Sequence, residues 1–221
     1  MTLKNFFGST DGIVKETIDF LRRPTFYGRA LMSTDSGTKY IDIKNIDNIA
    51  DAPCNPSIGG PAKGNVVREI DALGGEMGKN TDKSILQIKK LNTKKGPAVW
   101  ALRAQIDKVE YHKNMLETIK NQENLYLIEA MVEDLLIKDN KIYGVKTNTG
   151  EEIFGKCVIL TTGTYMKGQI LRGSSKHSGG PHGEKPSLYL SDNLKKLGFT
   201  IKRLKTGTPP RIEKSSIDYT N

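Results

Sequence analysis

A cysteine between two prolines, followed by a pair of glycines, is the feature that most constrains this chain. The stretch from Asp51 to Arg68 has the sequence DAPCNPSIGGPAKGNVVR. Pro53 and Pro56 fix φ on either side of Cys54, and Gly59-Gly60 permits a backbone path that residues with a Cβ resist. We therefore expect a tight turn that holds the thiol in place. A loop whose cysteine merely packs is the alternative.

A helix should follow this turn. Pro61 suits a first helical turn, and apolar residues then recur at spacings of four and three until Gly74-Gly75, which would end the helix. The free N–H groups at its start, with Lys63 beside them, favour anionic oxygens or a thiolate nearby. The sequence thus predicts a turn that faces a cofactor. The apolar residues are Val66, Ile70 and Leu73.

A longer helix is predicted from Gly96-Pro97 to Ile119. Apolar residues keep a spacing of three or four over this stretch, which predicts one buried face. Arg103 and Gln105 fall off that face, so they would be solvated unless they contact a ligand. The apolar residues are Val99, Leu102, Ile106, Val109, Leu116 and Ile119.

Short β-rich runs dominate the middle of the chain. Asp139-Asn140 and Thr149-Gly150 separate several of them and supply turns. The middle runs therefore predict a meander. The predicted strands are Ser84–Leu91, Leu125–Ile128, Val132–Ile137, Lys141–Asn148 and Glu152–Phe154.

A further strand, Lys156–Thr161, is continuously apolar and ends in Thr162-Gly163-Thr164. Such a run is typical of a buried parallel strand that ends at the ligand edge of an open sheet. Cys157 lies within it, and we expect it to be a core residue rather than a reactive one.

The C-terminal part should alternate loop, helix and strand. Gly168–Gly183 lacks periodicity and predicts a loop with solvent-facing His177 and His182. A helix over Pro186–Leu197, closed by Gly198, and a strand over Phe199–Leu204 should follow. KTGTPPR comes next, where Lys205 and Arg211 would suit phosphate contact, unless the segment is only a domain crossover.

The first 44 residues carry weaker signals. Asp11–Leu21 would form a short helix and Lys39–Ile43 a strand, and the early glycines stand alone, so they form no GxGxxG turn. Cys54 and Cys157 suggest neither a disulfide framework nor a metal site, and we expect no metal. With no apolar run near the ~20 residues that span a bilayer and no signal peptide, we expect a cytoplasmic protein. The formal charge of +9 fits either an RNA partner or a lysine-rich solvated surface.

Several separated strings resemble the glucose-inhibited division protein A family, also called MnmG, whose members modify tRNA uridine. The resemblance runs from about Asn45 to Asn221. The strings, in order, are CNPSIGGPAKG, REIDALGGEMGKN, LNTKKGPAVWALRAQIDK, VILTTGTYMKGQI and RLKTGTPPR.

The resemblance implies an α/β fold: a Rossmann-like FAD domain of the two-dinucleotide-binding class, with a β-meander and an inserted domain. Residues 1–44 would then replace the expected GxGxxG unit, 45–197 would form a partial FAD-binding domain, and 198–221 would begin the insert. A truncated or rearranged chain is the expectation that follows from these bounds.

The resemblance also implies a site. Cys54 matches the family's catalytic cysteine beside the flavin, where its thiolate would serve as nucleophile or proton carrier. Arg103, Lys205 and Arg211 are weaker predictions as RNA contacts. The residues that would contact FAD are Asn55, Ile58, Gly59, Gly60, Val132, Thr162, Gly163, Thr164 and Ser187.

The expected activity is addition of a carboxymethylaminomethyl group at C5 of the tRNA wobble uridine. FAD would be the cofactor, NADH and methylenetetrahydrofolate the co-substrates, and the GTPase MnmE the partner of a homodimer. A non-catalytic basic RNA-binding or scaffold remnant of the same fold is the alternative. An unrelated reductase with the same FAD half is a third, which the KTGTPPR and LRAQ strings disfavour.

Overall fold

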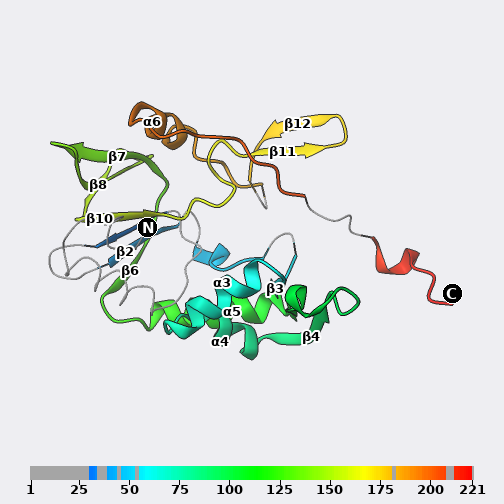
Figure 1. Ribbon diagram of the computed structural model, residues 1–221. Coiled ribbons are helices and arrows are strands. Elements are labelled where there is room, and N and C mark those ends of the chain that lie inside the picture. The colour runs from blue at the N-terminus through cyan, green and yellow to red at the C-terminus, as the bar shows by residue number, and fades with distance from the viewer. Residues whose placement is uncertain are drawn as a thin grey trace.

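A computed structural model describes residues 30–33, 39–43, 46–52, 55–180, 183–207 and 212–220. These residues form a mixed α/β structure with mostly antiparallel sheets (Figure 1). In Figure 1, helices α3, α4 and α5 lie with strands β3 and β4 in the lower body, while β7, β8 and α6 lie above.

A four-stranded sheet joins the two parts. Its order is β10-β1-β2-β6, with β2 and β6 parallel and β1 antiparallel to both neighbours. The predicted strands at 39–43, 125–128 and 156–161 are confirmed as strands. The strands are β1 (Ala30–Ser33), β2 (Lys39–Ile43), β6 (Leu125–Glu129) and β10 (Cys157–Leu160).

Strand β10 differs from its prediction in two ways. Its bonded neighbour β1 runs antiparallel, and all four of its residues are only half-buried. Cys157 is accordingly half-buried and not fully buried in the core as expected, while its lack of reactivity stays a prediction. The apolar run reflects contact on two faces: Ile159 packs on one hydrophobic cluster, and Val158 and Leu160 pack on another.

The first cluster lies beneath this sheet and is built from helices and a three-stranded antiparallel sheet of order β3-β5-β4. Its fully buried residues include Ile106, Tyr111 and Met115. The elements are η1 (Ile46–Asn48), β3 (Ser57–Gly59), α3 (Lys63–Ala72), α4 (Glu76–Lys83), β4 (Ile85–Leu91), β5 (Ala101–Ile106) and α5 (Lys108–Lys120).

Helix α3 confirms the helix predicted after the glycine pair. It ends before Gly74, whose φ is +85° and whose N–H donates to the Asp71 carbonyl oxygen. Val66 on the helix is 53% exposed, and Leu73 at its end is 39% exposed. The described residues therefore leave these two side chains partly uncovered.

The long helix predicted over 96–119 was wrong. Pro97–Val99 is a short 3-10 turn (η2), Ala101–Ile106 is the central strand β5, and only Lys108–Lys120 is helical. Asp107 starts that helix, since its side chain accepts hydrogen bonds from the Val109 and Glu110 N–H groups. The helix-like spacing upstream of Asp107 came from Val99 in the 3-10 turn and from Leu102 and Ile106 in the strand.

The second cluster lies against the other face of the central sheet. The predicted meander is confirmed as an antiparallel sheet of order β7-β8-β9, with the Asp139-Asn140 turn at φ of +50° and +59°. Helix α6 packs here through Leu190 and Leu194. The elements are β7 (Val132–Lys138), β8 (Lys141–Thr147), β9 (Glu152–Phe154) and α6 (Leu190–Lys196).

The remaining C-terminal predictions need correction. The predicted loop over 168–183 contains a hairpin of β11 (Gln169–Arg172) and β12 (Ser175–Ser178), whose side chains are largely exposed and so lack a core pattern. Helix α6 begins at Leu190 rather than Pro186 and ends near Gly198 as expected. Phe199–Leu204 pairs with no strand. The last turn, η4 (Lys214–Ser216), extends away from the body (Figure 1).

The predicted helix at Asp11–Leu21 lies outside the described residues. Within the described part of the chain, no helix combines the length and the apolar character needed to cross a bilayer.

Candidate functional site

One face of the β3-β5-β4 sheet is polar. Strand pairing sets two rows across this face, Ser57–Gln105–Gln87 and Gly59–Arg103–Lys89. The opposite face carries Ile58, Ala104 and Ile106, all buried. The sheet therefore has one side toward the core and one side lined by amides and cations.

Two glycines shape the edge of the polar face. Gly59 has φ of +116°, and a Cβ there would lie 2.2 Å from the Leu102 carbonyl oxygen. Gly60 has φ of +94°, its N–H donates to the same oxygen at 2.8 Å, and a Cβ there would meet nothing within 4 Å. Gly59 is thus required by packing, while Gly60 presents a flat backbone to open space.

Ser57 accepts hydrogen bonds from two cationic side chains at this edge. Arg103 Nε donates to Ser57 Oγ at 3.1 Å, and Lys63 Nζ donates to the Ser57 carbonyl oxygen at 3.4 Å. Partial burial lowers the pKa of Lys63 below its usual 10.5, and the charge of Arg103 lowers it further. Each cation therefore raises the electrostatic cost of the other.

No acidic residue offsets this charge on the sheet. Strands β3, β4 and β5 contain no Asp or Glu, and among the described residues neither Lys63 nor Arg103 forms a salt bridge. An anionic group placed on this face would relieve the repulsion. The arrangement suits a planar ligand with anionic or carbonyl oxygens, lying against Gly60 and held by Arg103 and Lys63.

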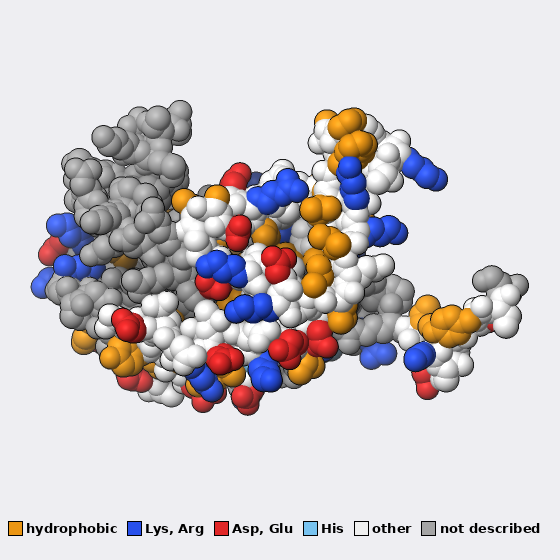
Figure 2. Space-filling view, turned by 90° about the horizontal axis from the view of Figure 1, so that it is seen from below, with side chains coloured by type: hydrophobic (Ala, Val, Ile, Leu, Met, Phe, Trp, Pro, Cys, Tyr) orange, Lys and Arg blue, Asp and Glu red, His pale blue; other side chains and the backbone are white. Residues whose placement is uncertain are grey.

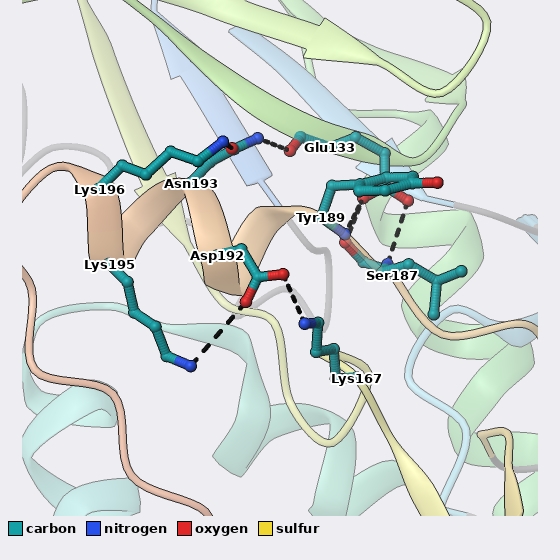
Figure 3. A network of polar contacts seen from close by, with 9 residues as sticks. Glu133, Lys167, Ser187, Tyr189, Asp192, Asn193, Lys195 and Lys196 are labelled. Atoms are coloured by element: carbon teal, nitrogen blue, oxygen red, sulfur yellow. Dashed lines mark hydrogen bonds and ion pairs between the residues drawn. The ribbon is translucent and has the colours of Figure 1, made fainter.

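A second group of predicted residues meets where β7 begins and α6 starts (Figure 3). Ser187 Oγ donates to Glu133 Oε2 at 2.9 Å and approaches the Val132 carbonyl oxygen at 3.4 Å. The N–H groups of Tyr189 and Leu188 donate to the same carboxylate at 2.8 and 3.3 Å, and Asn193 Nδ2 donates to the Glu133 carbonyl oxygen. Glu133 thereby fixes the segment that leads into α6.

The turn after β10 reaches the same junction. The Ser187 N–H donates to the Tyr165 carbonyl oxygen, and the Tyr165 N–H donates to that of Thr162. Lys167 then pairs with Asp192, and this hydrogen bond lowers the pKa of Asp192 (Figure 3). Val132, Ser187 and the Thr162–Thr164 turn are therefore close together, as a shared ligand would require.

The structure divides the predicted site residues into two groups and leaves three of them outside. Asn55, Ile58, Gly59, Gly60 and Arg103 belong to the sheet or the segment leading into it, and only the backbone of Ile58 is accessible, because its side chain is in the core. Val132, Thr162, Gly163, Thr164 and Ser187 belong to the junction. Cys54 and Arg211 lie outside the described residues, and Lys205 is exposed and belongs to neither group.

Sequence reasoning missed Ser57, Gln87, Lys89 and Glu133. The first three share a face only through strand pairing, which the helix predicted over 96–119 concealed. Glu133 follows Val132 directly, but its partners lie more than fifty residues away.

Two further expectations bear on ligands. His177 is exposed on β12, as predicted, and His182 lies outside the described residues. In the described part of the chain, no group of three His, Cys, Asp or Glu side chains would hold a metal ion. Basic and acidic side chains are interspersed over much of the face seen in Figure 2, so net charge alone defines no binding patch there.

Comparisons with known proteins agree with the strings quoted above. The family model described as glucose inhibited division protein A matches residues 29–221, a range that begins before Asn45. The tRNA uridine 5-carboxymethylaminomethyl modification enzyme MnmG of Geobacillus thermodenitrificans is 56% identical over 191 residues, and that of Geobacillus kaustophilus is 55% identical. These matches cover 86% of this chain and 30% of each relative.

Solved structures give the same result for the fold. The structure of Aquifex aeolicus GidA in its form I crystal matches 82% of this chain with a TM-score of 0.76 and 48% identity, and the form II crystal gives 0.75. The match covers 30% of the Aquifex chain. This chain therefore spans about 30% of the length of these relatives.

Proposed function

Because the chain belongs to the glucose-inhibited division protein A family, we propose that it forms part of a flavin-dependent enzyme that adds a carboxymethylaminomethyl group to the tRNA wobble uridine. The observation that carries the proposal is the polar sheet face, where Gly60, Arg103 and Lys63 offer a flat surface with unbalanced positive charge. By the same likeness, NADH and methylenetetrahydrofolate would be co-substrates, and the GTPase MnmE the partner of a homodimer.

The isoalloxazine end of FAD fits the polar face of the sheet. The isoalloxazine would lie against Gly59-Gly60 and the Asn55 backbone, with Arg103 and Lys63 near its carbonyl oxygens. When bound, the flavin would supply the redox and one-carbon chemistry. The chain's own residues would orient the ring and stabilise negative charge on it.

The junction would hold a more distant part of the same cofactor. Val132, Ser187 and the Thr162–Thr164 turn come together there, but Glu133, Tyr165 and Lys167 already bond the polar groups of Ser187. The junction would therefore contact the cofactor mainly through complementary shape, because the polar groups of Ser187 are already hydrogen-bonded within the protein. The sequence also has no GxGxxG turn for the pyrophosphate, so we expect this chain to bind FAD weakly.

Cys54 is our proposed nucleophile or proton carrier toward the uracil ring. A thiolate is needed for either role, and nearby positive charge lowers a thiol pKa. Residues 45–197 would form the partial FAD domain and residues 198–221 the start of an insert.

A chimera tests the activity. Residues 29–221 would replace the matching segment of the full-length Geobacillus thermodenitrificans enzyme, and the modified wobble uridine in tRNA would be measured by mass spectrometry of nucleosides. We expect activity, loss of activity in the Cys54→Ser chimera, and retained activity in the matched Cys157→Ser chimera. A folded chimera that modifies no tRNA, or a fully active Cys54→Ser chimera, would contradict the proposal.

Flavin uptake tests the cofactor separately. The chain would be titrated with FAD and followed by quenching of flavin fluorescence. Measurable binding that weakens in Arg103→Gln supports the site, whereas absence of any uptake supports the non-catalytic RNA-binding alternative.

A further inference from the structure

All charged residues of the β4–β5 hairpin have the same sign. Residues 84–106 contain four lysines and one arginine and no Asp or Glu. The strands hold this charge in register, since Lys89 pairs with Arg103 and Lys90 with Leu102. Five cations therefore sit on one hairpin with no carboxylate among them.

The tip of the hairpin has a defined shape. Asn92 adopts φ of +60°, its side chain donates to the Val99 carbonyl oxygen at 3.0 Å, and its own carbonyl oxygen accepts from the Lys95 N–H at 2.8 Å. These bonds close the connection into a compact turn. Lys94 and Lys95 are exposed on it.

Trp100 stands beside this turn and is 43% exposed. Lys90 Nζ lies 3.4 Å from its ring centroid, so an ammonium group covers part of the indole. Val99 and Leu102 on either side are 42% and 46% exposed. An aromatic ring framed by lysines is a typical surface for stacking a nucleic-acid base while cations contact phosphates.

Protection of a sheet edge explains only part of this pattern. β4 is an edge strand, and lysines on edge strands prevent pairing with other chains. That role accounts for Lys89 and Lys90, but Lys94 and Lys95 lie beyond the paired residues. An exposed tryptophan would also work against such protection.

We propose that the β4–β5 hairpin binds single-stranded or looped RNA, with Trp100 stacking on a base and Lys90, Lys94 and Lys95 contacting phosphates. Assigning tRNA as the natural RNA rests on the proposed function, but the binding surface does not. Lys90 and Leu102 alternate with Lys89 and Arg103 along their strands, so this RNA surface lies on the opposite face of the sheet from Arg103.

The single tryptophan makes a direct test possible. Since Trp100 is the only tryptophan of the chain, its fluorescence reports on this surface alone. Oligouridylate and a uridine-rich RNA stem-loop would be titrated into the 221-residue chain, with tryptophan quenching and the anisotropy of labelled RNA followed together. We expect both signals to saturate at the same RNA concentration and to weaken steeply with salt.

Two variants and a matched control sharpen the test. Trp100→Ala should weaken binding about tenfold through loss of stacking. Lys94→Gln/Lys95→Gln should lower the slope of log affinity against log salt by about 1 to 2. Lys138→Gln/Lys141→Gln removes the same charge at the exposed β7–β8 turn and should leave binding unchanged.

Three results would overturn the proposal: no RNA binding at low salt, binding without tryptophan quenching, or an equal loss in the control variant. Equal binding of polyglutamate would also overturn it, because that polymer has charge and no bases. FAD uptake measured on the same preparations separates the proposals: a chain that binds FAD but no RNA loses only this inference, and one that binds RNA but no FAD loses only the flavin site.

Discussion

The polar sheet face and the α6 junction both contain residues expected to contact a cofactor, but they treat their polar groups differently. At the junction, one Glu133 carboxylate accepts from Ser187, Leu188 and Tyr189, so donors and acceptor are matched. On the sheet face, Lys63 and Arg103 both reach Ser57, and the described residues provide them no carboxylate. Polar groups that already have partners within the protein mainly stabilise the fold. Charged groups without a counter-charge are those that a ligand of opposite charge can compensate.

Gly59→Ala should break the sheet face itself. A Cβ at Gly59 would lie 2.2 Å from the Leu102 carbonyl oxygen at a φ that disfavours side chains, so we expect a loss of about 3 kcal/mol in unfolding free energy or more. Gly60→Ala is the control, because its Cβ meets open space and only φ costs energy, about 1 kcal/mol. Urea denaturation measures both, and equal losses would show that the close contact is not what requires Gly59.

Glu133→Gln tests the junction as a structural unit. The substitution weakens charge-assisted bonds to three donors, and we expect a loss of about 2 kcal/mol in unfolding free energy. Glu152→Gln, an exposed change on β9, should stay within about 0.5 kcal/mol of the original chain. If the two variants unfold alike, the stabilising role of Glu133 at the junction is wrong.

Local signals in the sequence explain which parts of this fold could be predicted. The Asp139-Asn140 turn has residues that tolerate positive φ, and the meander around it was confirmed. The helix over 96–119 failed because Val99, Leu102 and Ile106 keep a three-and-four spacing by coincidence, while the true helix signal was the Asp107 cap. The exposed β11–β12 hairpin gave no apolar pattern.

The candidate site was harder to predict for a related reason. Gly59-Gly60 and Lys63 could be marked from turn and helix-start chemistry, and Arg103 from the family strings. Lys89 joins Arg103 only because β4 pairs with β5 in one register, and such non-local pairing is not written in any single segment. The hairpin surface around Trp100 was missed for the same reason.

Arg103→Gln should affect the sheet face without unfolding it. We expect FAD affinity to fall about tenfold through loss of a charge-assisted contact. The pKa of Lys63 should rise toward 10.5, because a neighbouring positive charge is removed while partial burial stays. Carbon-13 NMR of reductively methylated lysines measures that pKa, with exposed Lys138 as the internal reference.

The pH dependence of stability has a defined sign at this position. Since the folded state lowers the pKa of Lys63, the unfolded chain binds more protons between the folded pKa and 10.5, and unfolding free energy rises with pH through that window. Arg103→Gln should flatten this rise. An unchanged slope together with an unchanged Lys63 pKa would show that the two cations do not interact.

Asp192→Asn should have the smallest effect, and it completes the comparison between matched and unmatched charge. The hydrogen bond from Lys167 lowers the pKa of Asp192, so its contribution is present above the usual pKa of 3.8 and is lost as pH falls through the lower folded value. The carboxylate is exposed, and exposed ion pairs contribute little, so the urea midpoint near neutral pH should barely change. FAD and RNA binding should not change at all, because an ion pair that is already neutralised leaves nothing for a ligand to compensate. A marked loss of FAD binding in this variant would show that the junction contacts the cofactor through charge and not only through shape.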